Sequence, residues 1–533
     1  MQTLTLATVF CTLLLSQSFF SVQAQPDRSF RVMTFNIRLN VASDSTNAWP
    51  HRTDLVESMI RFHEADLIGV QEALENQMTD LKTILPDFGV HGVARDTSLQ
   101  WGEYSAIFYR RSRFEWLDGS TFWLSESPEM ASRGWDAALN RIVTWARFRD
   151  RFTDKVFFHF NTHFDHRGVE ARENSARLIM DKIAELNPEN LPVILTGDFN
   201  LTPTDSPYSI LTQDNPDKNL KDSYFESLSL HHGPASTWSG FVFPGEGDRR
   251  IDYIFTRNRV VVLKHATLSD SWSGRYPSDH LPVLAEILID PVMALPQAHS
   301  HNDYERSRPL WTALENGCTS VEADIWLIDD KLYVSHNRPM ITPKSPTLES
   351  LYLDPLARHV TENHGWIFPG YNRPVQLLVD IKNEGEATYE KLREVLKNYD
   401  YLLKPYGNRS ALLQIVISGE RPMAAILADS SRRVGLDGRP EDMGESYEAA
   451  IMPLISQRYS VVTSWKGKDV IPDAEMGALK TLADQAHRQG KKIRLWATPD
   501  DENVWKVLLE AGVDYINTDD PERLKKFLSK SGK

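Results

Sequence analysis

The chain has 533 residues, of which 41% are hydrophobic and 25% are charged. It is therefore long enough for two large domains, and its composition excludes a disordered polymer and a small stapled fold. The chain has 59 Lys and Arg residues and 73 Asp and Glu residues, which gives a net charge of −14. Non-specific binding of polyanions needs an excess of positive charge. Nucleic acid is therefore a less favoured substrate.

The first 24 residues form an uncharged, apolar stretch that ends in small and polar side chains. This pattern is typical of a secretory signal peptide cleaved near Ala24, and it predicts a secreted or periplasmic protein. Cleavage would remove Cys11 and leave only Cys318, so no intramolecular disulfide is expected. No later run of about 18 apolar residues follows, and we therefore expect no transmembrane segment in the mature chain.

Residues 29–290 alternate short β-rich segments with amphipathic helices. Val, Ile, Phe and Tyr alternate with polar residues in segments such as 155–164 and 191–200, which predicts sheet strands. Helical periodicity occurs at 52–63 and 171–187. These features predict a layered α/β domain.

A weakly charged segment with two prolines, 291–298, predicts a linker. Beyond it, over 299–530, strand-like runs such as 320–327, 375–383 and 460–465 alternate with helix-like runs. This order is typical of a (β/α) barrel, in which the chemistry gathers at the carboxyl ends of the strands.

Polar side chains gather at the ends of the predicted strands in the first half. Asp198 and Asn200 leave an apolar strand at positions i and i+2, so both side chains point to the same side. Either residue alone is equally typical of a turn, but a carboxylate beside a neutral amide suits a site that binds a hard cation and a phosphoryl oxygen. Other strand ends contribute Asn36, Glu72, His163, Asp252, Asp279 and His280.

In this order, the motifs resemble those of the deoxyribonuclease-like endonuclease/exonuclease/phosphatase superfamily, over residues 31–289. The resemblance implies a four-layer α/β sandwich that cleaves phosphate esters with Mg²⁺ or Mn²⁺. It places the metal ion on Glu72, with Asn36 and Asp279 close by. Arg38 stands where some members carry an acidic residue; we assign it to substrate binding, and the number of metal ions stays open.

The same resemblance gives roles to the other polar residues. Asp198 would orient the attacking water. Asn200 and His163 would hold the phosphate. His280, oriented by Asp252, would stabilise the transferring group. These roles agree with the chemistry, because phosphoester hydrolysis builds charge on oxygens that a metal ion and an imidazolium can offset.

The second half carries its own titratable residues. His299 and His301 open it, and Glu322 and Asp324 leave one strand at positions i and i+2 on the same face. Two carboxylates so close together are costly unless a cation lies between them. Later strand ends contribute His336, Asp380 and Lys382.

These residues resemble the glycerophosphodiester phosphodiesterase and phosphatidylinositol-phospholipase-C-like superfamily, over about residues 296–530. The resemblance implies a (β/α)8 TIM-like barrel that cleaves phosphodiesters with two histidines, one as general base and one as general acid. His299 or His301 would pair with His336, and Lys382 would contact the phosphate. Three carboxylates would hold Ca²⁺ or Mg²⁺: Glu322, Asp324 and Asp380.

Two phosphoester-cleaving folds in one exported chain predict a bifunctional, metal-dependent phosphoesterase for small polyol phosphates or phospholipid headgroups. A secreted nuclease is the alternative among enzymes. A barrel that only binds its ligand is the alternative from another class. The sequence leaves the leaving group and the oligomeric state open.

Overall fold

A computed structural model describes most of the chain, namely residues 28–96, 102–215, 218–242, 249–404, 410–431 and 433–531. The signal peptide predicted at 1–24 lies outside these residues. Within the described part, no helix has both the length and the apolar character needed to cross a bilayer.

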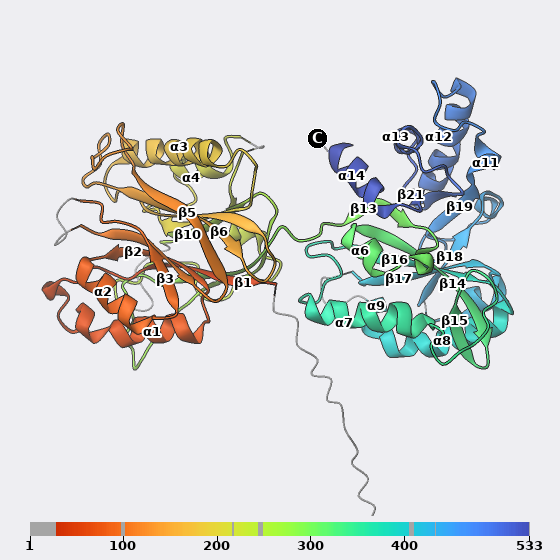
Figure 1. The fold of residues 1–533 in the computed structure, drawn as a ribbon, viewed down its shortest axis with the longest axis horizontal. Coiled ribbons are helices and arrows are strands. Elements are labelled where there is room, and N and C mark those ends of the chain that lie inside the picture. Colours follow the sequence, from red (N-terminus) through yellow and green to blue (C-terminus); the bar gives the residue numbers. More distant parts are fainter. Residues whose placement is uncertain are drawn as a thin grey trace, which may run out of the picture.

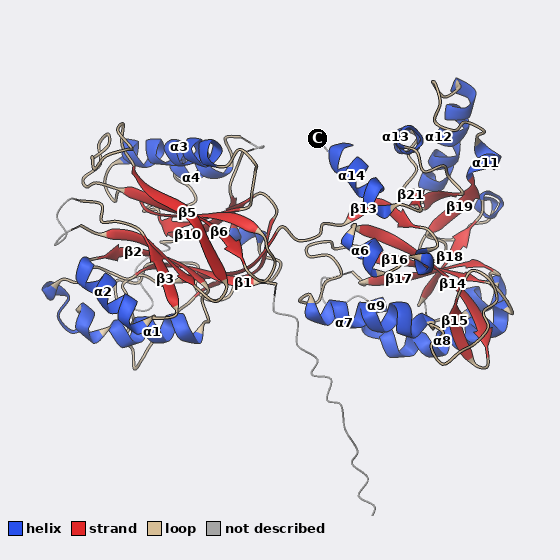
Figure 2. Ribbon diagram, viewed as in Figure 1, coloured by secondary structure: helices blue, strands red, loops and turns tan. Residues whose placement is uncertain are grey.

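The first domain is built on two six-stranded mixed sheets that stack face to face (Figures 1 and 2). The first sheet has the order β11-β12-β1-β2-β4-β3, with β1 (Phe30–Asn36), β2 (Leu67–Ala73), β3 (Phe88–His91), β4 (Tyr104–Arg110), β11 (Val260–Thr267) and β12 (Val283–Ile289). The second has the order β5-β6-β7-β8-β10-β9, with β5 (Phe114–Trp123), β6 (Ile142–Asp150), β7 (Val156–His163), β8 (Val193–Asp198), β9 (Lys221–Asp222) and β10 (Asp252–Arg257).

Helices cover both outer faces of this pair of sheets. In Figure 1, α1 (Thr53–Phe62) and α2 (Glu75–Ile84) lie under the first sheet, and α3 (Val169–Leu186) and α4 (Ser206–Thr212) lie over the second. A short helix, α5 (Ser223–Glu226), follows β9. The four-layer α/β sandwich is thus confirmed.

The period of two along each strand produces this layering. On β1, Phe30 and Val32 pack between the two sheets, whereas Met33 and Phe35 pack against the helices. Each face of the strand therefore belongs to a different core, which is why the strand is apolar on both sides.

A layer of polar side chains also joins the two sheets. From β7, Asn161 Nδ2 donates to the carbonyl oxygens of Val70 and Ala106 in the first sheet, at 3.0 Å each. Its Oδ1 accepts from Gln71 Nε2 at 2.7 Å and from Thr196 Oγ1 at 3.0 Å. All these groups are buried, so the three bonds of Asn161 to Val70, Ala106 and Gln71 fix the spacing and register of one sheet against the other, while the bond to Thr196 lies within the second sheet.

The second domain is a closed barrel of eight parallel strands, in which β13 pairs with both β14 and β21. Its strands are β13 (Leu295–Ser300), β14 (Cys318–Ile328), β16 (Val375–Ile381), β17 (Leu413–Gly419), β18 (Val434–Gly438), β19 (Leu454–Arg458), β20 (Lys492–Trp496) and β21 (Tyr515–Thr518). The strand β15 (Lys331–Val334) forms an antiparallel hairpin with β14. The predicted TIM-like barrel is confirmed, and its first strand begins within the segment 291–298 that the sequence suggested as a linker.

Helices surround the barrel (Figure 2). They are α6 (Trp311–Glu315), α7 (Asp354–Glu362), α8 (Gly385–Leu396), α9 (Asp400–Leu403), α10 (Met423–Ala428), α11 (Tyr459–Val462), α12 (Asp473–Arg488), α13 (Glu502–Glu510) and α14 (Pro521–Ser531). The strand predicted at 460–465 is wrong, because α11 and a loop occupy it and β19 precedes it. The β-branched residues Val461, Val462 and Thr463 favoured a strand by propensity, which tertiary packing overrides here.

Asn161→Ala tests the polar layer between the sheets. The substitution removes the side-chain donor from two buried carbonyl oxygens and one acceptor from the Gln71 amide, so we expect the free energy of unfolding of the first domain to fall by about 3 kcal/mol. Urea denaturation followed by tryptophan fluorescence measures it. Asn187→Ala, which removes two hydrogen bonds within one loop, is the control and should cost less. Equal losses in the two variants would contradict a special role of Asn161.

Candidate active sites

Side chains on one face of each strand run from the core to the first site, which lies at the edge of the two sheets. Along β8, Ile194 packs in the apolar layer between the sheets, Thr196 joins the polar layer, and Asp198 ends the row. On β7, Asn161 and His163 follow the same order. Two-residue steps thus deliver polar side chains from both sheets to one edge.

Asn36, at the end of β1, connects the two sheets within this site. Its Nδ2 lies 3.0 Å from Glu72 Oε1, 2.9 Å from Asp198 Oδ2 and 3.4 Å from His280 Nε2. Its Oδ1 accepts a hydrogen bond from the Arg38 amide. The sequence prediction that these distant residues meet agrees with this geometry.

Glu72 reaches the site through a local distortion of β2. Strict alternation would turn its side chain toward the helices, together with Ile68 and Val70. The pairing of β2 with β4 shifts register between Val70 and Ala73, and Glu72 has a φ of 64°. A bulge of this kind re-aims a side chain, and left-handed backbone in a residue with a side chain stores strain at functional sites.

Asp252 and His280 form a buried pair on the other side of Asp198. Asp252 opens β10 directly opposite Asp198 in the antiparallel register. Its Oδ2 lies 2.9 Å from His280 Nδ1, and His280 Nε2 lies 3.8 Å from Asp198 Oδ2. Asp252 therefore fixes the orientation of the imidazole, as the sequence analysis expected of this pair.

His163 and Asn200 meet next to Asp198. Asn200 Nδ2 lies 3.1 Å from His163 Nε2, and the Asn200 amide donates to Asp198 Oδ1 at 3.0 Å. His163 Nε2 lies 3.4 Å from Asp198 Oδ2. These two residues, predicted to hold the phosphate, are thus in contact with the residue predicted to orient the water.

Two arginines border the carboxylates of this site. Arg38 pairs with Asp44 at 2.9 Å, and its guanidinium lies 3.8 Å from Asp279 and 4.0 Å from Glu72. Arg52, which the sequence analysis missed, is fully buried and donates to the carbonyl oxygens of residues 37, 38, 47 and 277. Arg52 thereby ties the loop after β1 to the loop that carries Asp279.

The charges in the site perturb one another strongly. Burial and the nearby Asp252 raise the pKa of Asp198 to about 7. Burial alone would lower the pKa of His280, but Asp252 and Asp198 hold it well above its usual value. Burial also raises the pKa of Glu72 in principle, yet the His280 charge and the Asn36 hydrogen bond hold it below its usual value. Burial raises the pKa of Asp279. A carboxylate base and a protonated imidazole thus coexist near neutral pH.

The donor set of this site fits a divalent cation. Ligand atoms of Glu72, His163 and Asp198 lie within 4.8 Å of one another, as do those of Asp198, Asp252 and His280. Because His280 is held by Asp252, the first of these groups is the better candidate. Carboxylate oxygens of Glu72 and Asp198 match the preference of Mg²⁺ or Mn²⁺ for oxygen, whereas Asn36 turns its Nδ2 toward these carboxylates and its Oδ1 toward the Arg38 amide.

The second site lies at the carboxyl ends of the barrel strands. Along β14, Val321, Ala323 and Ile325 pack outward, so Glu322 and Asp324 face the interior. One oxygen each of Glu322, Asp324 and Asp380 lies within 4.8 Å of the others. This acidic cluster was predicted as a metal site, and the structure brings all three residues together.

Lys382 lies inside this acidic cluster. Its Nζ is 2.8 Å from Asp324 Oδ2 and 3.2 Å from Asp380 Oδ1. Burial raises the pKa of Asp380 to about 6 in spite of Lys382. Asp324 Oδ1 is buried and accepts no hydrogen bond from the described residues, so it has a lone pair free for a cation.

The two early histidines have different surroundings. His299 is fully buried, with Nδ1 at 2.7 Å from Ser320 Oγ and Nε2 at 3.3 Å from Glu322 Oε2. Arg494 Nη1 donates to that same Nε2 at 2.8 Å. His301 instead pairs with Asp519 at 2.8 Å. Burial and Arg494 lower the pKa of His299 to about 4, whereas Asp519 raises the pKa of His301 against the effect of burial.

His336 borders the acidic cluster on its exposed side. Its Nδ1 lies 3.2 Å from Asp324 Oδ2 and 3.2 Å from the Tyr304 hydroxyl. Tyr304 also donates to Asp324 Oδ2 at 2.7 Å. Tyr304, Arg494 and Asp519 were missed by the sequence analysis, because a lone tyrosine, arginine or aspartate after a strand carries no distinctive spacing.

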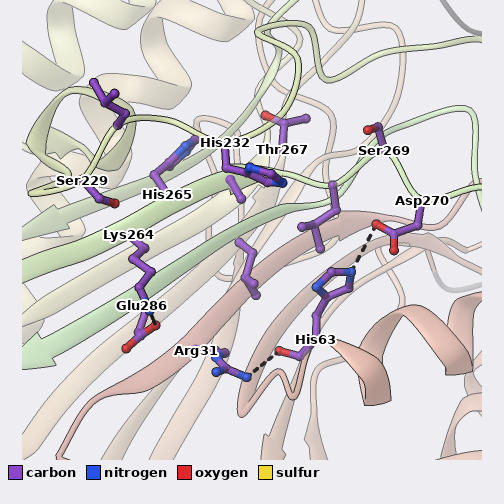
Figure 3. A pocket seen from close by; sticks show the side chains of 14 residues that line it. Arg31, His63, Ser229, His232, Lys264, His265, Thr267, Ser269, Asp270 and Glu286 are labelled. Carbon is purple, nitrogen blue, oxygen red and sulfur yellow. Dashed lines mark hydrogen bonds and ion pairs between the residues drawn. The ribbon is translucent and has the colours of Figure 1, made fainter. Parts of the chain in front are cut away.

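A separate cavity of about 590 Å³ opens on the first domain (Figure 3). Its charged lining groups already have partners: His63 Nε2 lies 3.2 Å from Asp270, Lys264 lies 2.8 Å from Glu286, and Arg31 pairs with Glu64 outside the lining. It contains none of the predicted site residues. We therefore assign the chemistry to the two clusters above.

Family models match both halves of the chain. Residues 33–280 match the Endonuclease/Exonuclease/phosphatase family, residues 288–436 match the AIM6-like phosphodiesterase domain, and residues 492–522 match the Glycerophosphoryl diester phosphodiesterase family.

Curated relatives carry the name that the AIM6-like phosphodiesterase model abbreviates. Altered inheritance of mitochondria protein 6 of Eremothecium gossypii is 32% identical over 278 residues, which cover 44% of this chain and 70% of the relative. Its homolog in Arthroderma benhamiae is 28% identical over 289 residues, 48% of this chain and 87% of the relative.

Solved structures resemble about half of the chain. An endonuclease/exonuclease/phosphatase from Bacteroides vulgatus is 40% identical and aligns over 49% of this chain and 99% of its own, with a TM-score of 0.47. The mannosyl-6-phosphatase of Bacteroides thetaiotaomicron is 36% identical over 49% of this chain and 99% of its own, with a TM-score of 0.46.

The raised pKa of Asp198 makes the metal-free first domain sensitive to pH. An unfolded aspartate has a pKa of about 3.9, so the folded domain keeps this proton to higher pH than the unfolded chain does. The stabilisation that the Asp198 proton provides is lost as the pH rises toward the pKa of about 7 in the folded state. The stabilisation from the His280 proton is lost at still higher pH. In EDTA, we therefore expect Asp198 to contribute a fall in the free energy of unfolding between about pH 5 and pH 8, read as the difference between the wild type and Asp198→Asn. The difference is needed because the buried His159, His163 and His265, whose pKa values are lowered, contribute a rise below about pH 6.5.

Urea denaturation at the two pH values measures this fall. Asp198→Asn should reduce it, because the neutral amide does not titrate, and Mg²⁺ should oppose it by binding the ionised site. Asp181→Asn, at an exposed position of α3, is the matched control. A fall as large in Asp198→Asn as in the wild type would contradict the assignment.

Proposed function

The chain belongs to the endonuclease/exonuclease/phosphatase family through its first half and to the AIM6-like phosphodiesterase family through its second, and on that premise we propose that this phosphoester hydrolase is exported, bifunctional and metal-dependent. The observation that carries the proposal is the pair of buried, cation-ready clusters, one around Asp198 and one around Glu322 and Asp324. Each lies at strand ends, and each has histidines in contact with its carboxylates.

In the first site, each residue has a different role in hydrolysis. Mg²⁺ or Mn²⁺ on Glu72, with Asn36 and Asp279 close by, would offset charge on the phosphoryl oxygens. Asp198 receives a proton from the attacking water, a task that a pKa near neutrality favours. His280 stays protonated beside Asp252 and donates to a phosphoryl oxygen as negative charge develops there.

The same site binds the phosphate before the reaction. Asn200 and His163 contact each other next to Asp198, so an oxygen that they hold lies close to the base. Arg38 lies on the other side, among Asp44, Asp279 and Glu72, where it orients an anionic substrate. Positioning of this kind converts the attack on phosphorus into an effectively intramolecular step.

In the barrel, His299 and His336 are the acid–base pair that we favour. Both touch the acidic cluster, His299 through Glu322 and His336 through Asp324, whereas His301 is turned to Asp519. The low pKa of His299 leaves it unprotonated at neutral pH, and as a general base it would take a proton on Nε2 in place of the hydrogen bond from Arg494. Glu322, Asp324 and Asp380 would hold Ca²⁺ or Mg²⁺, and Lys382 would meet the phosphate.

Small polyol phosphates and phospholipid headgroups are the substrates that we propose. The net charge of −14 provides no general attraction for a nucleic acid, while a small ester needs only the local cations of the sites. The barrel would split a diester, and the first domain would then act on a phosphate that remains. Export to the periplasm or the exterior rests on the apolar first 24 residues.

Crossed substitutions test the two activities. Asp198→Asn should lower turnover at the first site by about 10³-fold and spare the barrel, while His336→Ala should do the reverse. The measurement compares release from a sugar phosphate and from a glycerophosphodiester in Mg²⁺ or Ca²⁺, and EDTA should abolish both. Plasmid nicking without release from these small esters would favour the nuclease, and an unchanged diesterase in His336→Ala would favour a barrel that only binds.

Alanine at each early histidine tests the assignment within the barrel. We expect His299→Ala to lower diester turnover by about 10²-fold or more, because it removes the base, and His301→Ala to lower it far less. Steady-state kinetics on a glycerophosphodiester decide between them, with thermal unfolding of both variants as the check on folding. The opposite order of losses would transfer the role to His301.

A further inference from the structure

Arg458 and Trp496 form a stacked pair at the mouth of the barrel, and neither has been given a role so far. They are the last residues of β19 and β20 and are paired in the parallel register of these strands. The Arg458 guanidinium lies 5.4 Å from the centre of the Trp496 ring. Arg458 is exposed and Trp496 is partly exposed. The pair is therefore accessible at the end of the barrel that carries the acidic cluster.

Strand alternation places both side chains over the interior of the barrel. Leu454, at the start of β19, packs in a small core made only of strand residues, which lies inside the barrel. Arg458 stands two even steps beyond Leu454 and so leaves the strand on the same face. On β20, Trp496 stands one such step beyond Arg494, which donates to His299 inside the barrel. The stacked pair thus faces the same space as the second site.

Around the barrel, the pair lies across the mouth from the acidic cluster. The eight parallel strands follow in the order β13-β14-β16-β17-β18-β19-β20-β21 before the barrel closes. Strand β19 is therefore four strands from β14 in either direction, which places Arg458 opposite Glu322 and Asp324. The interior of an eight-stranded barrel is only wide enough for side chains or one small ligand. A diester whose phosphate is bound at the acidic cluster therefore extends one of its alcohols toward Arg458.

Arg458 differs from other cations at this end of the barrel because it has no carboxylate partner. Five cations at or just after strand ends each pair with a carboxylate within 3.8 Å: Arg306, Lys382, Arg421, Arg439 and Arg494. Among the residues that the structure describes, none forms an ion pair with Arg458 or accepts a hydrogen bond from its guanidinium. Stacking uses one face of the guanidinium and leaves the N–H donors at its edge free for a ligand.

We propose that Arg458, held in place by Trp496, binds a second anionic group of the diester substrate, a carboxylate or a phosphate on the alcohol that lies across the mouth from the acidic cluster. This inference rests on the proposed diesterase function of the barrel and specifies its headgroup class. The planar guanidinium fits either anion through two parallel hydrogen bonds. A quaternary ammonium headgroup is disfavoured, because Arg458 repels it and covers the Trp496 face that would otherwise attract it.

Glycerophosphodiesters with matched headgroups test this specificity. The full chain carries Asp198→Asn, so that the first site does not act on phosphate monoesters, and the buffer contains Mg²⁺ or Ca²⁺. Glycerophosphoserine and glycerophosphoethanolamine differ by one carboxylate, glycerophosphoglycerol and its terminal phosphate ester differ by one phosphate, and glycerophosphocholine carries a quaternary ammonium. We expect kcat/KM to be about tenfold or more higher for the anionic member of at least one pair, which identifies the anion, and lowest for the choline ester.

Arg458→Met should remove this preference for the anionic diester. We expect the loss mainly as a rise of about tenfold or more in KM, because the distant anion is bound equally in the ground state and the transition state. Turnover of the neutral diester should change by less than about threefold, and that of the choline ester should rise, since the Trp496 face is uncovered. Arg458→Lys keeps the charge without the planar fork and should retain part of the preference.

Arg488→Met is the matched control. Arg488 is also exposed, but it ends α12 just before β20 begins and therefore lies at the opposite end of the barrel. This variant should keep the preference for the anionic diester. Thermal unfolding of every variant checks that the barrel stays folded.

The possible results separate this inference from the proposed function. Equal kcat/KM values within both matched pairs, or a preference that survives in Arg458→Met, would overturn the role of Arg458. Losses of equal size on all five diesters in Arg458→Met would also overturn it. In each of these cases the barrel remains a diesterase. Absence of turnover on all five diesters, in this chain and in the wild type, would instead refute the proposed function of the barrel.

Discussion

The first active site depends on one buried amide that holds two sheets together. Asn161 extends from the second sheet and bonds to two backbone carbonyl oxygens of the first. One step further along the same strand lies His163, and one step beyond Thr196 lies Asp198. Because Asn36 and Glu72 come from the first sheet, a shift between the sheets of even one ångström would separate the ligands from the base.

Both sites solve the same electrostatic problem with different folds. Each brings carboxylates together out of water, where their mutual repulsion is large, and each places cationic side chains next to them. In the sandwich, these cations are His280, Arg38 and Arg52; in the barrel, they are Lys382 and Arg494. A metal ion bound as we propose would complete a charge balance that the protein has already largely built, which would limit the reorganisation needed during the reaction.

Periodicity explains which parts of the sites could be predicted from sequence. Asp198, His163 and Asn36 stand at even steps from apolar residues that face the same layer, so their convergence follows from the period of two. Glu72 breaks this rule, and only the bulge in β2 returns its carboxylate to the site. Arg52 and Arg494 resemble surface arginines in sequence, because their burial depends on contacts between distant segments that no local pattern encodes.

The Tyr304 hydroxyl helps to determine which nitrogen of His336 carries a hydrogen. It has one hydrogen and three polar neighbours: Asn302 Oδ1, Asp324 Oδ2 and His336 Nδ1. When that hydrogen goes to Asp324, the oxygen of Tyr304 must accept from His336, so the neutral imidazole carries its hydrogen on Nδ1. The ring nitrogen that remains free to exchange protons with substrate is then Nε2, so Tyr304 and Asp324 together select the tautomer of His336.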